Sequence, residues 1–213
     1  MIEDIEKQWS LGDEWANSLT HGIGFVLSLV GFMFLLQSPM MEGNHWKLFS
    51  FTIYGFSLVL LYGASTFYHA CKNRQLKHAL RLLDHCAIYI LIAGSYTPFT
   101  LVSMQGFWGW TLFALVWMIA IVGIIFKCFY IGRFVRLSTC LYLAMGWLIV
   151  IAIEPLMNSL SFEGLCWIAA GGLFYTSGII FFLLDAKRFF HAIWHLFVLG
   201  GSVCHFFAVL LHT

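Results

Sequence analysis

The chain is dominated by seven long apolar runs, each about as long as the hydrocarbon core of a membrane is wide. Only 10% of its 213 residues are charged and 61% are hydrophobic, so few positions interrupt these runs. A helix that crosses a membrane needs about 20 mainly apolar residues, and in lipid it satisfies its own backbone hydrogen bonds. We therefore predict an all-α integral membrane protein whose seven transmembrane helices cover residues 17–37, 46–70, 79–101, 107–126, 136–154, 163–185 and 190–212.

The predicted spans leave connectors too short for a further domain, so residues 17–213 are expected to form one seven-helix domain. Residues 1–16 precede this domain and carry five acidic residues against a single lysine. That charge does not suit the n-region of a secretory signal sequence. We expect this N-terminal segment to form an interfacial helix, with Trp9 and Trp15 in the headgroup layer.

Basic residues are concentrated in alternate connectors. The connectors after the second, fourth and sixth spans contain Lys72, Arg74, Lys77, Lys127, Arg133, Arg136, Lys187 and Arg188. In the other three connectors Lys47 is the single basic residue. The positive-inside rule therefore predicts that the N-terminus and the basic connectors are cytoplasmic and that the C-terminus is outside. This orientation is the reverse of that of the seven-helix receptors that couple to G proteins.

The charge balance and the cysteines exclude several other classes of protein. A formal net charge of +1 provides no excess of basic residues to neutralise phosphates, so no nucleic-acid partner is expected. The six cysteines include no CxxC pair, and their positions imply no disulfide framework. The sequence also contains no P-loop, GxSxG or dinucleotide-binding motif.

Polar and ionisable residues lie within three of the predicted spans, where such groups are costly and indicate function. Ser65 and His69 are four residues apart near the cytoplasmic end of the second span, and His191 and His195 have the same spacing at the start of the seventh. Each pair therefore occupies one face of its helix. Asp84 lies near the cytoplasmic start of the third span. The predicted orientation places all five side chains in the inner leaflet.

This convergence favours a metal site. A lone histidine within a membrane is more often a hydrogen-bonded contact between helices than a metal ligand. Two histidines four apart, with a third and a carboxylate at matching depth, reverse that preference. Three neutral imidazoles with one open position are the ligand set of a catalytic zinc site, so we predict that His69, His191 and His195 bind Zn²⁺.

The other polar residues near the predicted zinc site have roles that the sequence leaves open. In a zinc site Asp84 would orient a water molecule or take its proton, as a catalytic residue. Ser65 could stabilise a developing oxyanion, or it could return a hydrogen bond to its own helix. His21 either holds a metal ligand or Asp84 in place from outside the site, or it packs between helices. His85 points about 100° away from Asp84 around the helix, so it is not expected to share the site.

The motifs that contain these residues resemble the bacterial hemolysin III proteins, the prokaryotic branch of the superfamily of progestin and adiponectin Q receptors. The resemblance is carried by Glu14-x2-Asn17-x2-Thr20-His21-Gly22, Ser65-x3-His69, the 83–89 stretch, Tyr96-Thr97-Pro98-Phe99 and His191-Ala192-Ile193-Trp194-His195. It implies a multi-pass protein of the bacterial inner membrane, with zinc near the inner face. It also implies that His69, His191 and His195 are the ligands and that Asp84 acts through a bound water.

The superfamily is related to the alkaline ceramidases. The resemblance therefore implies a zinc-dependent hydrolase acting on a membrane lipid, either an amide or an ester. His85 stands where the eukaryotic receptors generally have tyrosine, so receptor ligand specificity is not implied. Two alternatives stay open, namely a non-catalytic regulator of membrane lipid homeostasis and a pore-forming cytolysin, although the spans carry no polar stripe to line a pore. The sequence does not indicate an oligomeric state.

Overall fold

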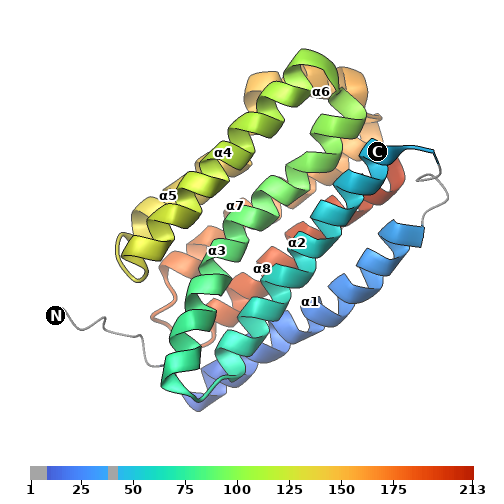
Figure 1. The fold of residues 1–213 in the computed structure, drawn as a ribbon. Coiled ribbons are helices and arrows are strands. Elements are labelled where there is room, and N and C mark those ends of the chain that lie inside the picture. The colour runs from blue at the N-terminus through green and yellow to red at the C-terminus, as the bar shows by residue number, and fades with distance from the viewer. Residues whose placement is uncertain (1–8, 38–42) are drawn as a thin grey trace.

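The computed structural model describes residues 9–37 and 43–213 and confirms seven helical segments long and apolar enough to cross a membrane (Figure 1). The described residues contain no β-strand. The helices are α1 (Leu11–Gln37), α2 (His45–Ala70), α3 (Arg74–Pro98), α4 (Gly106–Tyr130), α5 (Val135–Gly146), α6 (Ile153–Ser159), α7 (Phe162–Leu183) and α8 (Phe190–His212). Helices α5 and α6 together form the fifth span, and α1 packs against both α2 and α8.

The bundle places polar side chains inside and apolar side chains outside, as expected for a protein in lipid. In α1 the buried face includes Asp13, Asn17 and His21, which are spaced four residues apart. Leu19 and Ile23, on the other side of α1, are exposed. Helices α2 and α3 are the most buried and form much of the core. A polar stripe on a transmembrane helix therefore identifies the face that packs inside the bundle.

Two spans are interrupted near a proline. Pro98 ends α3, and a π-helical segment over Phe99–Met104 extends the third span beyond the predicted end. The fifth span reaches Ser159, five residues beyond the prediction, through a 3₁₀ segment over Leu148–Ala152. Pro155 lies in the first turn of α6, where its missing N–H removes no helical hydrogen bond. The chain thus stays helical through the membrane by changing the type of helix.

The start of α1 lies at the same end of the bundle as the α2–α3 and α4–α5 connectors, and the C-terminus lies at the other end (Figure 1). The predicted interfacial segment ends inside α1, because residues 11–16 form the first turns of this helix. Its residues 1–8 lie outside the described part of the chain. Ser10 and Asp13 form a capping pair, in which the Asp13 N–H donates to Ser10 Oγ at 3.2 Å. Which end is cytoplasmic stays a prediction.

Candidate metal centre

Three buried histidines from two helices meet at the end of the bundle where α1 begins. His69 lies in the last turn of α2, and His191 and His195 occupy the first two turns of α8. One ring nitrogen of each can be chosen so that all three lie within 4.8 Å of one another. The ring centroids are 5.3 Å apart for His69 and His191 and 4.7 Å apart for His191 and His195. The gathering predicted from the sequence is therefore confirmed.

Neighbouring oxygen atoms fix the tautomers of two of these histidines. His69 Nδ1 lies 2.6 Å from Glu14 Oε2, and His195 Nδ1 lies 3.1 Å from the Asn17 carbonyl oxygen. A carboxylate and a carbonyl oxygen only accept hydrogen bonds, so each Nδ1 carries the proton. The Nε2 atoms of both rings are buried and have no hydrogen-bond partner among the described residues. Their lone pairs are left for a metal ion, which fits the group that the sequence predicts.

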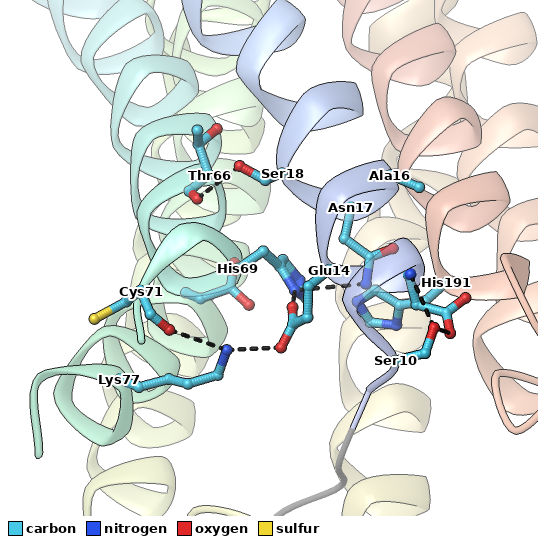
Figure 2. A network of polar contacts seen from close by, with 12 residues as sticks. Ser10, Glu14, Ala16, Asn17, Ser18, Thr66, His69, Cys71, Lys77 and His191 are labelled. Atoms are coloured by element: carbon cyan, nitrogen blue, oxygen red, sulfur yellow. Dashed lines mark hydrogen bonds and ion pairs between the residues drawn. The ribbon is translucent and has the colours of Figure 1, made fainter. Parts of the chain in front are cut away.

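Glu14 links the histidine cluster to the start of α3. While Oε2 accepts from His69, Oε1 accepts from Lys77 Nζ at 2.6 Å, as Figure 2 shows. Lys77 Nζ also lies 3.4 Å from the Cys71 carbonyl oxygen. The carboxylate is therefore held on both sides, and it holds the His69 ring in one orientation. Such an outer partner raises the basicity of a metal-binding imidazole and fixes its direction.

The other two histidines also have polar neighbours. Thr20 Oγ1 lies 3.2 Å from His195 Nδ1, next to the Asn17 carbonyl contact. His191 Nδ1 lies 3.7 Å from Asp185 Oδ2, which is beyond hydrogen-bond length but within reach of an ion pair. His69 and His195 are thus oriented by hydrogen bonds to oxygen atoms from outside the cluster, whereas His191 only lies near the Asp185 carboxylate. Carboxylate–histidine–metal arrangements of this kind are usual around zinc.

Asp84 and Ser65 lie beside the cluster rather than in it. Asp84 is buried in α3 and interacts electrostatically with His191 and Ser65. The Ser65 hydroxyl is buried and makes no hydrogen bond of ordinary geometry with the described residues. It therefore does not return a hydrogen bond to its own helix, which was one of the two expected arrangements. Asp84 therefore lies near His191, and its catalytic role stays a prediction.

His21 and His85 occupy different surroundings. The His21 ring stacks on that of His195, with centroids 3.5 Å apart and planes inclined by 12°. Neither nitrogen of His21 has a hydrogen-bond partner in the described chain, so His21 contacts a candidate ligand by stacking alone. His85 Nδ1 donates to the Arg81 carbonyl oxygen at 2.8 Å. His85 is therefore outside the cluster, as the helical geometry predicted.

Comparison with known proteins assigns the chain to a family. A sequence profile of the family described as Haemolysin-III related matches residues 9–206. The chain belongs to this family. Hemolysin-3 of Bacillus cereus is 48% identical over 94% of the chain and 92% of its own length. The Hemolysin-3 homolog of Bacillus subtilis is 47% identical over 96% of both chains.

The haemolysin-III-related chain also has eukaryotic relatives. The human monocyte to macrophage differentiation factor is 30% identical over 91% of the chain and 82% of its own length. No solved structure matches the chain significantly. The seven apolar helices and the bacterial relatives together make it a multi-pass bacterial membrane protein.

The structure adds partners to this haemolysin-III-related site that the sequence reasoning did not assign. Glu14 and Asn17 belong to a motif whose residues received no individual role from the sequence, and Asp185 received no role either. The available signal was the spacing of Asp13, Asn17 and His21 along one face of an otherwise apolar helix. Asp13 Oδ1 accepts from the Phe189 N–H at 2.8 Å and so ties the start of α1 to the start of α8.

We expect Glu14→Gln to weaken zinc binding by about 10-fold to 100-fold, the usual cost of losing an outer-shell partner. Glutamine keeps the size of the side chain but gives up the charge that holds the His69 and Lys77 groups together. The measurement is a competition titration of the purified protein against a chelator of known zinc affinity. Glu163→Gln is the matched control, because Glu163 is exposed at the start of α7. An unchanged affinity in Glu14→Gln would contradict the assigned role.

Proposed function

We propose that this protein is a zinc-dependent hydrolase of a lipid amide or ester. The observation that carries the proposal is the pair of buried Nε2 lone pairs on His69 and His195, with His191 within reach of the same point. Three neutral imidazoles are a ligand set of catalytic zinc, and zinc is redox-inactive, which suits hydrolysis. The family resemblance to lipid amide hydrolases supports the same reaction class.

The side chains around the cluster match the tasks of such a reaction. A zinc ion bound there supplies Lewis-acid activation of water and of a carbonyl group. Asp84 then orients the attacking water and accepts its proton, and the Ser65 hydroxyl donates a hydrogen bond to the carbonyl oxygen as negative charge develops on it. The water oxygen forms the new bond to the carbonyl carbon. The C–N or C–O bond breaks, and the amine or alcohol leaves with a proton from Asp84.

The position of the cluster supports a lipid as the substrate. His69, Asp84 and His191 all lie inside the membrane-spanning segments. His69 and His191 are each one residue from the end of their helix, and Asp84 is nearly three turns into α3. A scissile bond just below the headgroup of a lipid lies at a similar depth. By the predicted orientation this is the inner leaflet of the bacterial membrane. Apolar side chains such as Leu19 and Phe67 cover the lipid-facing surface nearby.

The name of the Bacillus cereus relative would instead suggest a pore-forming cytolysin. The interior of the bundle argues against a lumen through one chain, because large side chains fill it. Phe51, Tyr54 and Tyr62 are buried between the helices, and Tyr62 Oη donates to Ser202 Oγ at 2.7 Å. The open Nε2 atoms suit a metal ion in either the hydrolase or a non-catalytic regulator. A set of three imidazoles leaves a fourth coordination position open, and this favours the hydrolase.

The proposal is tested with purified protein and a broad panel of amide and ester lipids. We expect at least one class to be hydrolysed. Product formation should stop after treatment with a chelator and should resume when zinc is added back. The products are identified by mass spectrometry as a fatty acid and the matching amine or alcohol. Protein that holds zinc and yet hydrolyses none of the panel would contradict the proposal.

A further inference from the structure

A second group of buried polar side chains lies on the far side of α3 from the histidine cluster. Asp84 faces the histidines, whereas Cys86 and Tyr89 lie about 140° to 200° further around the helix. The Tyr89 ring packs against α5 through Tyr142, with ring centroids 4.5 Å apart. It also fills the space beside Gly123 of α4, where a Cβ atom would overlap the ring. Tyr89 therefore lies where α3, α4 and α5 meet.

Lys127 enters the same region from α4. It is three residues from the end of this helix and was expected in the basic connector, but α4 continues to Tyr130. A lysine near the end of a transmembrane helix normally extends its ammonium group to the interface. Lys127 is only 1% exposed, so its side chain is directed into the bundle instead.

No carboxylate of the described residues forms an ion pair with this buried lysine. Lys127 forms no ion pair or hydrogen bond with the described residues, and its electrostatic neighbours are the Cys86 thiol, the Arg81 guanidinium group and the His85 imidazole, none of them a carboxylate. Arg81 is itself a cation and increases the excess of positive charge. A buried charge without a partner is strongly unfavourable, so this arrangement calls for an anion from outside the chain.

Two hydroxyl groups nearby also lack partners. Tyr89 Oη and Ser138 Oγ are buried and near each other, and neither makes a hydrogen bond of ordinary geometry with the described residues. Tyr89 is linked to Lys127 through Cys86, which interacts electrostatically with both. More than about 90% of buried polar groups in native structures are satisfied. One ammonium group and two hydroxyl donors in one place form a suitable set for a phosphate group.

We propose that Cys86, Tyr89, Lys127 and Ser138, here termed the Lys127 pocket, bind the phosphate of an anionic membrane lipid. The depth supports a lipid as the source, because Lys127 lies within one turn of the end of α4 and the next connector carries Arg133. Lipid phosphates occupy this layer, and basic residues on the cytoplasmic side attract anionic lipids. A water molecule could satisfy the two hydroxyl groups, but it would leave the lysine charge uncompensated. This proposal does not depend on zinc or on hydrolysis.

The test measures thermal unfolding of the full-length protein in nanodiscs of phosphatidylcholine, with and without added phosphatidylglycerol. We expect the anionic lipid to raise the unfolding midpoint of the wild type and to have no such effect on Lys127→Met. The methionine variant is expected to fold, because it replaces an uncompensated buried charge with an apolar chain of similar length. Arg133→Gln is the control for general charge effects, because Arg133 is exposed in the adjacent connector. It should respond to the lipid like the wild type.

Native mass spectrometry measures the same interaction directly. Loss of a charge-assisted hydrogen bond should lower retention of phosphatidylglycerol by about 10-fold to 100-fold in Lys127→Met. Tyr89→Phe and Ser138→Ala should each lower it several-fold. The proposal would be overturned if phosphatidylglycerol stabilised Lys127→Met as much as the wild type. It would also be overturned if Arg133→Gln lost as much phosphatidylglycerol as Lys127→Met. Stabilisation by inorganic phosphate in phosphatidylcholine discs, with none from the anionic lipid, would overturn the assignment to a lipid.

Discussion

The double variant His191→Ala, His195→Ala should contain almost no zinc, whereas the wild-type protein should hold about one ion per chain. Both histidines lie on one face of α8, and their removal leaves His69 as the single imidazole of the cluster. One imidazole cannot retain the ion against the purification buffer. The measurement is elemental analysis of detergent-purified protein, normalised to the protein concentration.

His205→Ala is the matched control for this loss. His205 lies in the same helix, but its Nε2 is 3.3 Å from the Ile168 carbonyl oxygen, away from the cluster. This variant should keep the zinc content of the wild type. If the double variant also kept it, the three histidines would not form the metal centre, and the proposed chemistry would fail with them. A fall in thermal stability should accompany the loss of zinc, since a metal that binds only the folded state stabilises that state.

The depth and the helices of the histidine cluster could be predicted from the sequence because they depend on short-range regularities. The length of apolar runs located the spans, and the i and i+4 spacing placed His191 and His195 on one face. Basic connectors then assigned both helices to one end of the bundle before any contact was known. The meeting of His69 with the α8 histidines follows from these three facts together.

The orientation of the histidine rings could not be predicted in the same way, because it depends on how α1 packs. Glu14 contacts His69 across 55 positions of sequence, and Asn17 contacts His195 across 178. Only the packing of α1 against both α2 and α8 creates these contacts. The sequence shows that α1 has a polar face but does not show which histidine each polar group meets.

Lys127 illustrates a second limit of sequence reasoning. Near the end of an apolar span, a lysine that reaches the interface and a lysine that turns inward have the same sequence pattern. The difference depends on the space that neighbouring helices leave, here beside Gly123 and the ring of Tyr89. The count of basic residues placed Lys127 at the same end of the bundle as the histidine cluster. It could not indicate that the Lys127 side chain is buried.

Asp84→Asn should lower lipid hydrolysis by about 10²-fold to 10⁴-fold, the usual contribution of a general base, while the zinc content stays that of the wild type. Asparagine has nearly the same shape as aspartate but cannot accept a proton from water. Asp84 lies outside the set of three histidines that can share an ion, so its loss should not release the metal. The measurement pairs product formation from the responsive lipid class with elemental analysis of the same preparation.

The combination of these two readouts separates a catalytic role of Asp84 from a structural role. Glu154→Gln makes the same change from carboxylate to amide at an exposed position near the other end of the bundle, and it should alter neither quantity. Loss of both zinc and activity in Asp84→Asn would mean that Asp84 supports the metal centre rather than the chemistry. Full activity with full zinc would remove Asp84 from the mechanism. A non-catalytic zinc protein would show a third pattern, in which His69→Ala lowers stability and Asp84→Asn leaves cellular lipid composition unchanged.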